Sequence, residues 1–545
     1  MSSNKKYWKS VEELKGSSVV ETLKQKEFAE EIPVDEFLGD EESLGNSKTS
    51  RRDFLKYVGF STAAASLAAC EGPVVKSIPY VVQPENIVPG VANYYASTIA
   101  NGFDFQSVLV KTREGRPIKI ENNDLAKVKA GGGARVNASV LSLYDKKRVK
   151  RPMIDGKNVS WEEFDRQVGS ALNGVSGDIV LLTQTFASPS TTKLIQEFSA
   201  KYPNVKHVVY DVVSEDAALS AFESRYGRRA LPNYDFSEAE AIVSIGADFL
   251  GDWQGGGYDV SYAKSRVPEN GKMSRHVQFE SNLSLAGAKA DKRVPVKPSQ
   301  QKAILAALYG YIVGGGSTSE LPSNIDEAVV KAASQLREAG NKAVVVSGIP
   351  DADAQSLVLA INEALGSTIM NTDNARMTRQ GNVAQVSELV QSMNSGSVGA
   401  LMVVGVNPAY SLPNASEFVE GLKNVEVSVS FTMKEDETAK LCKYIAATPH
   451  YLESWGDIQF TDQQFSLMQP TIRPLFDTRQ FQDCLLKWSG NSQSYSDYIK
   501  ETWSGNLSGG WNQALHDGVF EGTSPVAIGA SEDFTSLSND ASSLR

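Results

Sequence analysis

Short apolar runs, rich in β-branched residues, recur along the chain from about residue 160, and helical patterns separate them. The runs lie at residues 179–182, 241–245, 343–346, 401–404 and 425–427. Runs of this length are typical of buried strands. Helices are predicted at residues 188–201, 300–312, 325–339, 354–365 and 415–422. Strands that alternate with helices predict an α/β fold made of doubly wound, parallel-sheet subdomains.

Two of the predicted strands end in a glycine that is followed closely by a small polar residue. Asp248 follows Gly246, and Asn407 follows Gly405. Ligands of open α/β sheets bind at the carboxyl ends of strands. Because a tight turn produces the same pattern, Asp248 and Asn407 are candidate pocket residues without a predicted catalytic role.

The composition is that of an acidic globular protein. With 545 residues, 41% hydrophobic and 22% charged, the chain can bury the cores of two or three subdomains. The net charge of -11 and the pI of about 5.2 argue against a nucleic-acid-binding surface, which needs clustered Lys and Arg, and favour a basic partner. No apolar run reaches the roughly 18 residues that a membrane-spanning helix needs.

Cysteines and histidines are too few and too scattered to predict a metal site. The three cysteines, Cys70, Cys442 and Cys484, form no C-x-x-C pattern, so iron–sulfur clusters and haems are not expected. Two separate buried thiols are favoured over a Cys442–Cys484 disulfide. The four histidines are His207, His276, His450 and His516. Of these, His450 follows Pro449 and is a candidate for a partner interface.

An export signal lies at residues 50–56, where S-R-R-D-F-L-K matches the twin-arginine pattern through Arg51, Arg52, Phe54 and Leu55. A small-residue segment follows and ends in L-A-A-C at Cys70, which resembles a bacterial lipoprotein box. We therefore expect export by the twin-arginine pathway to the periplasmic face of the cytoplasmic membrane, with acylation of Cys70. Two or three acyl chains hold a protein on a membrane without a spanning helix.

About 50 residues precede the paired arginines, which is unusual for a signal peptide. Their opening, Y-W-K-S-V-E-E-L at residues 7–14, resembles the extended leader of exported molybdopterin and iron–sulfur subunits of bacterial respiratory complexes. The predicted organisation has four parts. These are a leader with lipoprotein box (1–70), a small N-terminal subdomain (71–160), α/β subdomains (161–530) and a Ser-rich tail (531–545).

Six stretches, in family order, resemble the molybdopterin oxidoreductases, the family that includes formate dehydrogenases, nitrate reductases and polysulfide reductases. They are G-R-P-I-K-I-E-N-N (115–123), A-S-V-L-S-L-Y-D-K-K-R (138–148), S-W-E-E (160–163), G-V-N-P-A (405–409), E-T-A (437–439) and L-E-S-W-G-D (452–457). The resemblance implies a molybdopterin-oxidoreductase-like fold. For Glu453, within the last stretch, a helix cap or an ion pair explains the residue as well as a place in a pocket does.

The departures from the family pattern concern its cofactors. The last cluster cysteine of the family would fall near Gly133, where this chain has none. The molybdenum ligand would fall in residues 211–216, where Ser214 and Asp216 are chemically possible, although an acidic surface turn is favoured. The family's P-G-T-D is P-S-Q-Q at residues 298–301, without the glycine or the acid, which weakens the case for a pterin dinucleotide. We expect no cofactor, metal ligand or catalytic residue on this chain.

One branch of the family combines these features. The long leader, the lack of cluster cysteines and the stretch P-H-Y-L-E-S-W-G-D (449–457) resemble the B subunits of alternative complex III. The resemblance implies a respiratory quinol:electron acceptor oxidoreductase in which this portion supports a ferredoxin-like iron–sulfur domain. It also implies a multihaem cytochrome c, integral membrane quinol-binding subunits and, as a further partner, a terminal oxidase. No cysteine-rich run follows residue 491, so we expect the clusters in a missing C-terminal half or in a partner subunit.

Two other functions remain open from the sequence. The first is an active exported molybdopterin oxidoreductase that uses Ser214 or Asp216 as its metal ligand. The second is a lipid-anchored binding protein that shares only the fold. Bound molybdenum in the purified protein would favour the active enzyme over a scaffold. Purification of the chain without redox partners would favour the binding protein over a scaffold.

Overall fold

The computed structural model describes residues 90–528, except residues 103, 129–132, 269–270, 272, 315–320 and 508. These residues belong to one compact unit, Glu85–Arg545. The export-signal residues Arg51, Arg52, Phe54 and Leu55, and the lipidation candidate Cys70, lie outside the described residues.

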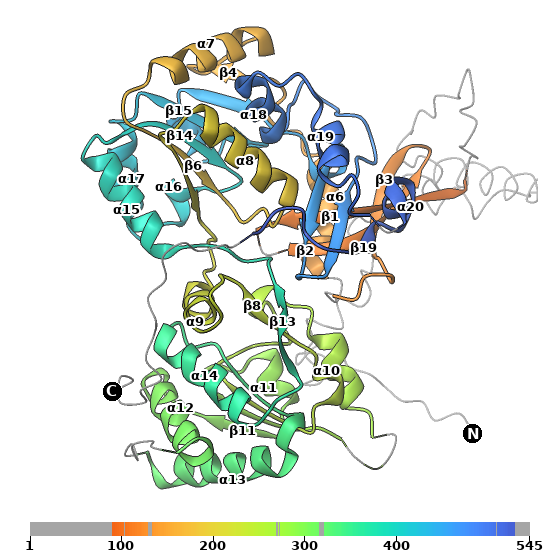
Figure 1. Ribbon diagram of the computed structural model, residues 1–545, viewed down its shortest axis with the longest axis vertical. Helices are drawn as coiled ribbons and strands as arrows, with labels where there is room; N and C mark the ends of the chain where they lie inside the picture. The colour runs from red at the N-terminus through yellow and green to blue at the C-terminus, as the bar shows by residue number, and fades with distance from the viewer. Residues whose placement is uncertain are drawn as a thin grey trace, which may run out of the picture. The chain divides into compact units, whose positions relative to one another are not determined.

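A seven-stranded sheet forms the largest part of the fold (Figure 1), with the strand order β5-β4-β16-β15-β14-β6-β7. Its members are β4 (Met153–Ile154), β5 (Lys157–Asn158), β6 (Asp178–Thr183), β7 (Val205–Val209), β14 (Val398–Val404), β15 (Val427–Thr432) and β16 (Tyr444–Ala447). The five strands from β16 to β7 are parallel, and β4 pairs antiparallel with β16. The central strands β6 and β14 are buried along almost their whole length, which explains why their sequences are nearly continuous apolar runs, whereas the edge strand β7 is largely not buried.

Helices cover both faces of this sheet. On one face lie α7 (Trp161–Gly174), α8 (Pro189–Lys201), α18 (Phe481–Ser489) and α19 (Tyr495–Thr502), and on the other lie α15 (Val383–Asn394) and α17 (Ala415–Leu422). Successive residues of β6 alternate between the two cores, Leu181 facing the first set and Leu182 the second. The S-W-E-E stretch begins α7, since the Ser160 hydroxyl caps the backbone N–H of Glu163.

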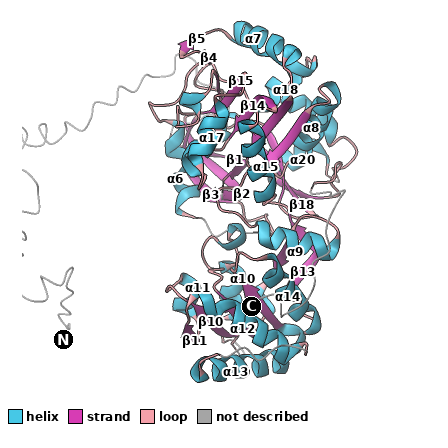
Figure 2. Cartoon of the chain, turned by 90° about the vertical axis from the view of Figure 1, so that its left-hand side faces the viewer, coloured by secondary structure: helices cyan, strands magenta, loops and turns pink. Residues whose placement is uncertain are grey.

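Between β7 and β14 the chain builds a second parallel sheet with the order β11-β10-β9-β12 (Figure 2). Its strands are β9 (Ala241–Ile245), β10 (Arg275–Glu280), β11 (Lys292–Pro295) and β12 (Ala343–Ser347). Its core contains residues of α12 (Pro298–Ile312), α13 (Ser323–Ala339) and α14 (Ala352–Ala364). On the opposite face, α10 (Asp259–Ser265) contributes Tyr262 to an aromatic cluster. Close by in sequence are α9 (Asp216–Tyr226), β8 (Leu231–Tyr234), α11 (Leu285–Lys289) and β13 (Met370–Arg376).

Antiparallel sheets complete the described fold. One contains β1 (Ala92–Asn101), β2 (Asp104–Arg113) and β3 (Arg116–Asn122), a second contains β17 (Gly456–Gln459), β18 (Gln464–Met468) and β19 (Val519–Glu521), and a two-stranded sheet pairs β8 with β13. Helix α6 (Ala134–Leu143) packs on the first sheet through Val136, Val140 and Leu143. The remaining short helices are α16 (Pro408–Ser411) and α20 (Gly510–Asp517).

The predicted α/β fold with doubly wound parallel sheets is confirmed. The apolar runs at 179–182, 241–245, 343–346 and 401–404 are β6, β9, β12 and β14. The strand predicted at 425–427 is misplaced, because β15 begins only at Val427. Val425 lies in the preceding turn, and its side chain packs into the core beneath α15 and α17. Within the described residues, no helix is long and apolar enough to cross a membrane.

Candidate functional site

A cleft of about 500 Å³ lies at the carboxyl ends of the large parallel sheet. It opens between β6 and β14, where the strand order reverses, because β7 follows β6 on one side and β15 follows β14 on the other. Such a switch point is where open α/β sheets form their binding crevices. The location therefore makes this cleft the candidate functional site.

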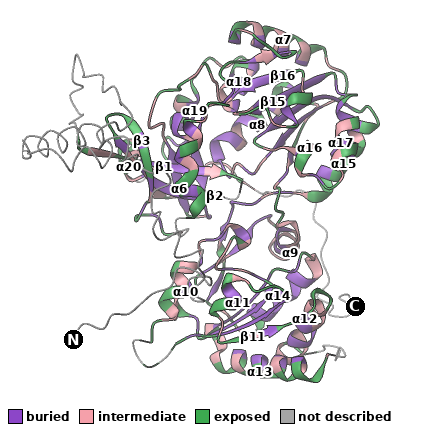
Figure 3. Ribbon diagram, turned by 180° about the vertical axis from the view of Figure 1, so that it is seen from behind, coloured by how far each residue is buried: buried purple, intermediate pink, exposed green. Residues whose placement is uncertain are grey.

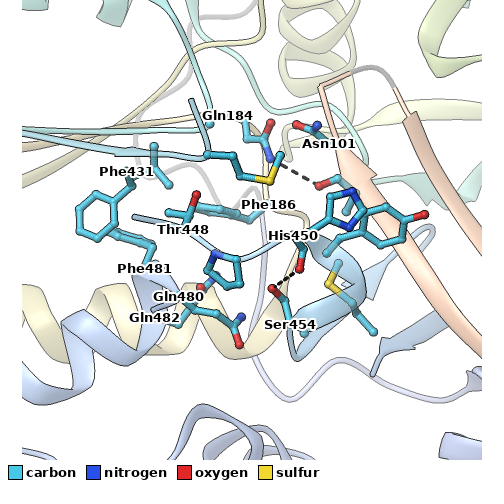
Figure 4. A pocket seen from close by; sticks show the side chains of 18 of the residues that line it. Asn101, Gln184, Phe186, Phe431, Thr448, His450, Ser454, Gln480, Phe481 and Gln482 are labelled. Carbon is cyan, nitrogen blue, oxygen red and sulfur yellow. Dashed lines mark hydrogen bonds between the residues drawn. The ribbon is translucent and has the colours of Figure 1, made fainter. Parts of the chain in front are cut away.

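Aromatic and uncharged polar side chains make up most of the cleft (Figure 4). Lining residues are Asn101, Ser142, Gln184, Phe186, Phe431, Thr448, His450, Trp455, Gln480, Phe481 and Gln482, among others. Phe431 and Phe481 meet edge to face, with ring centroids 5.0 Å apart, at the end of the cleft away from His450. Asn407 also lines the cleft, and it is the candidate pocket residue from the sequence that does so. The other lining residues come from segments that only the fold brings together.

Gly405 allows the two central strand ends to approach each other. Its φ of +70° is in the left-handed region, and a Cβ there would lie 3.0 Å from Cδ of Gln184. The Gln184 side chain fixes the opposite wall, since its Oε1 accepts from the N–H of Gly102 at 3.0 Å. The glycine of the G-V-N-P-A stretch is thus required for the shape of the cleft.

Asn407 lies in the cleft wall and also organises a turn, as both sequence interpretations allowed. Its Oδ1 accepts from the hydroxyl of Thr438 at 2.7 Å, and its Nδ2 donates to Glu437 at 2.7 Å. These hydrogen bonds join the G-V-N-P-A stretch to the E-T-A stretch, although thirty residues separate them in sequence. The two family-like motifs are therefore one local structure.

His450 is buried, with 1% of its surface exposed, and it faces the cleft, so the sequence hypothesis of a partner interface is wrong. Its Nδ1 accepts from the N–H of Leu452 at 3.2 Å, which places the ring proton on Nε2, 2.9 Å from the Ser142 hydroxyl and 3.2 Å from the Ser139 carbonyl oxygen. Burial lowers the pKa of His450 to about 4. The ring is neutral and both nitrogens are engaged.

Glu453 forms an ion pair with Arg148 in which neither side chain is exposed to solvent. Its carboxylate lies 2.5 Å from one Arg148 nitrogen and also accepts from the backbone N–H groups of His450 and Leu475. Burial acts to raise the pKa of Glu453, but the hydrogen bonds from Arg148 and the backbone outweigh it and lower that pKa. Arg148 ends the A-S-V-L-S-L-Y-D-K-K-R stretch, so this pair joins two further motifs.

Asp457 is fully buried at the base of the cleft, and both of its carboxylate oxygens are engaged. It accepts from the Ser188 hydroxyl at 2.5 Å, from the backbone and hydroxyl of Ser190 at 3.0 and 2.7 Å, and from the Trp503 indole at 2.7 Å. These donors begin α8 and follow α19. Asp457, on β17, therefore connects α8 and α19 to the antiparallel sheet of β17. Its carboxylate oxygens are occupied by hydrogen bonds within the protein.

The charged residues at the cleft rim are also engaged. Lys434 pairs with Asp145 at 2.5 Å. Asp436 accepts from the N–H of Ala439 at 2.8 Å, and burial raises its pKa. Among the described lining residues, the ionisable groups hold the walls together, and the arrangement supports binding or structure better than acid–base chemistry.

The segment where the family's molybdenum ligand would fall, residues 211–216, does not fit that role. Ser214 is exposed, and its hydroxyl accepts from the N–H of Asp216 at 3.1 Å. Asp216 forms an ion pair with Arg229, and the Asp211 carboxylate accepts from the Thr185 hydroxyl at 2.7 Å. Neither Ser214 nor Asp216 lines the cleft. Within the described ranges, no group of three or more His, Cys, Asp and Glu side chains is placed to hold a metal ion.

The second parallel sheet has its own switch point, between β9 and β12, and side chains of the chain occupy it. The side chain of Gln301, from the P-S-Q-Q stretch, packs against Gly246. A Cβ added to Gly246 would lie 3.1 Å from Oε1 of Gln301. Asp248 accepts from the N–H of Ala286 at the start of α11, at 2.9 Å. Asp248 is thus a structural residue outside the cleft, in agreement with the turn interpretation.

Cys442 and Cys484 are both free thiols, as predicted. Burial raises the pKa of the Cys442 thiol to about 12 and that of the Cys484 thiol further still. Both thiols are therefore protonated and inert at neutral pH.

Comparison with known proteins agrees with this architecture. No family model matches the chain. The chain is 24% identical over 507 residues to the menaquinone reductase, molybdopterin-binding-like subunit, of Nitratidesulfovibrio vulgaris, a match that covers 81% of this chain and 72% of that protein. Among solved structures, acetylene hydratase from Pelobacter acetylenicus, a molybdopterin enzyme, matches with a TM-score of 0.60 and 11% identity, over 79% of this chain and 74% of that chain. The predicted molybdopterin-oxidoreductase-like fold is confirmed, and the sequence match supports a molybdopterin-oxidoreductase-like family.

Proposed function

We propose that this chain, with its molybdopterin-oxidoreductase-like fold, is a subunit of a respiratory quinone oxidoreductase, in which it acts as a scaffold and not as the catalytic centre. The observation that carries the proposal is the similarity, over 81% of the chain, to a subunit described as molybdopterin-binding-like in a menaquinone reductase. A respiratory complex of that kind works at a membrane and needs redox partners.

The contacts of the motif residues support a scaffold. The Arg148–Glu453 pair, the Asn407–Thr438 contact and the Asp457 hydrogen bonds use the family-like motifs to join distant segments. In the segment where the family's molybdenum ligand would fall, the side chains of Ser214 and Asp216 are exposed or paired elsewhere. These features are expected of a subunit whose fold serves as a scaffold for partner subunits.

In its finer form, the proposal places the chain in alternative complex III, exported by the twin-arginine pathway and anchored through Cys70 on the periplasmic face. Its partners are a ferredoxin-like iron–sulfur domain, a multihaem cytochrome c, integral membrane quinol-binding subunits and a terminal oxidase. Electrons pass through the clusters and haems of those partners, and this chain bears no cofactor.

The test is purification of the epitope-tagged chain from membranes of its native host in mild detergent. We expect iron–sulfur, multihaem and integral membrane subunits in stoichiometric amounts, together with quinol oxidation by the complex. Recovery of the chain alone, with no quinol-oxidising activity, would contradict the proposal and favour a lipid-anchored binding protein.

An active molybdopterin oxidoreductase that uses Ser214 or Asp216 is the second candidate. The exposed Ser214 and the Asp216–Arg229 ion pair argue against it. Elemental analysis of the purified complex decides: molybdenum at one atom per chain, lost in the Ser214→Ala or Asp216→Asn variant, would establish this candidate in place of the scaffold.

A further inference from the structure

The outer face of the first antiparallel sheet carries a row of basic side chains. In the register of β1, β2 and β3, Tyr94 lies opposite Lys111, Lys111 opposite Lys119, and Arg113 opposite Arg116. Residues directly opposite in antiparallel strands point to the same side of a sheet. We call Tyr94, Lys111, Arg113, Arg116 and Lys119 the basic face. Helix α6 packs on the other side of the sheet, against Val110 and Ile120.

The side chains of the basic face are exposed, except for that of Lys111, which is partly buried, and most have no acidic partner among the described residues. The exposed fraction is 49% for Tyr94 and 61% for the Lys119 side chain. Figure 3 colours much of β3 as exposed. The Lys111 ammonium lies 5.5 Å from the centre of the Tyr94 ring, and only Lys119 has an ion pair among the described residues, with Glu121 at 2.9 Å. Four positive charges on one small surface repel one another unless an anionic partner covers them.

The wider sequence around this face is also basic. Residues 111–157 contain thirteen Lys and Arg against five Asp and Glu, a net charge of +8 within a chain of -11. The sequence expectation that basic residues are not concentrated is therefore wrong, because a net charge averages an acidic majority with one basic region. The region fits an anionic surface.

We propose that the basic face docks on the anionic phospholipid headgroups of the membrane to which the chain is anchored. This inference rests on the proposed function for the anchor: Gly90 lies twenty positions after Cys70, a tether of at most about 70 Å. Tyrosine favours the boundary between headgroups and acyl chains. Ile118, 48% exposed on β3, adds an apolar contact. The proposed anchor at Cys70 favours headgroups over an acidic protein partner, because an anchored chain stays within reach of the membrane surface.

The experiment measures binding of the full chain carrying Cys70→Ala to vesicles, so that no acyl anchor contributes. Vesicles of phosphatidylcholine alone are compared with vesicles that contain phosphatidylglycerol. We expect binding to the anionic vesicles only, with a steep loss as salt rises. The triple variant Arg113→Gln, Arg116→Gln, Lys119→Gln should bind roughly a hundredfold more weakly.

The matched control is Lys264→Gln, Lys289→Gln, Lys331→Gln, which removes the same charge from exposed positions elsewhere. It should bind the anionic vesicles like the parent, and unchanged circular dichroism should show that both variants fold. Equal loss in the two variants, or equal binding of the parent to both vesicle types, would overturn the proposal. Binding of the parent that does not weaken as salt rises would overturn it as well, without the need for any variant.

Two further outcomes separate this inference from the proposed function. If the triple variant binds vesicles normally but loses a co-purifying subunit in native membranes, the basic face docks an acidic protein, and only the lipid inference fails. If the parent binds anionic vesicles but purifies from native membranes without redox subunits, the proposed function fails and the lipid inference stands.

Discussion

Glu453 and Arg148 show how much a single buried contact contributes to this fold. Both side chains are fully buried, and the Glu453 carboxylate also accepts backbone N–H groups on two segments. Loss of one member of a buried ion pair leaves the other charge without compensation in a low-dielectric interior. Glu453 therefore stabilises the fold whether or not the cleft binds a ligand.

Glu453→Gln should lower the free energy of unfolding by about 3–5 kcal/mol, because Arg148 remains buried without a counter-charge. Urea denaturation followed by circular dichroism measures the change. The control is Glu420→Gln in the surface pair with Lys423, where both side chains are 64% exposed. That control should change stability by less than about 0.5 kcal/mol. Similar effects for the two substitutions would show that the buried pair is not a major stabilising contact.

The protein should become less stable as the pH is lowered, because His450 is buried as a neutral ring. The folded pKa of about 4 lies below the ordinary value of 6.5. Between these values the unfolded chain binds a proton that the folded chain does not, so acid favours unfolding. The contribution is present above pH 6.5 and is lost as pH falls toward 4, about 3 kcal/mol in all. His276, with a pKa also lowered to about 4 by burial, adds a second such contribution.

Unfolding free energies measured from pH 7.5 to 4.5 should therefore decline less steeply in His450→Gln than in the parent. The control is His516→Gln, at a side chain that is 83% exposed, and it should leave the pH dependence unchanged. A parent protein whose stability does not change over this range would contradict the buried neutral state.

At the scale of elements, close approaches of the backbone determine how strands end at the switch points. Gly348 follows β12, and a Cβ there would lie 2.5 Å from the carbonyl oxygen of Gly246, which follows β9. Neither loop can move without disturbing two buried strands. The glycine is thus needed for steric reasons that its own backbone angles do not reveal.

Gly348→Ala should destabilise the protein by about 1–3 kcal/mol through overpacking between the loops after β9 and β12. The control is Gly174→Ala near the end of α7, where a Cβ would meet nothing within 4 Å. That substitution should be neutral or stabilising by up to about 1 kcal/mol, since alanine favours the helix. Thermal denaturation compares the two, and equal melting temperatures would contradict the proposed crowding.

At the scale of the whole molecule, the proposed export by the twin-arginine pathway predicts that the paired arginines Arg51 and Arg52 are required. Arg51→Lys combined with Arg52→Lys should leave the chain in the cytoplasm, because the export receptor recognises the two guanidinium groups. Cell fractionation with immunoblotting measures the distribution. The control is Lys146→Arg with Lys147→Arg, which also preserves charge, and should be exported normally. Export of the double-lysine variant at the parent level would contradict a twin-arginine signal.

Cys70 provides a separate test of the anchor. Mass spectrometry of the exported chain should find an acylated N-terminal cysteine at position 70, and metabolic labelling with a fatty acid should be lost in Cys70→Ser. The control Cys442→Ser should keep the label, because Cys442 is a partly buried thiol within the fold. A mature chain that begins elsewhere, or that carries no lipid, would contradict the lipoprotein assignment.

The sequence by itself determined the fold class and most of the central elements. Apolar runs such as 401–404 became buried strands because burial on both faces permits no polar alternation. The positions of α8, α13 and α17 followed from the helical patterns between the apolar runs. The glycine at 405 marked a strand end at the cleft, and the motif order indicated the fold that the comparisons confirm.

The tertiary structure alone decided which motifs meet and what their residues do. Arg148 and Glu453 are 305 residues apart, and Ser188 and Asp457 are 269 apart, so no local pattern pairs them. The antiparallel register likewise gathered Lys111, Arg113, Arg116 and Lys119 on one face, although the net charge suggested no basic surface. Periodicity reports whether a side chain is buried, because burial repeats with the geometry of a helix or strand. The partner of a buried or charged group depends on how distant segments pack, and that is fixed only when the whole chain folds.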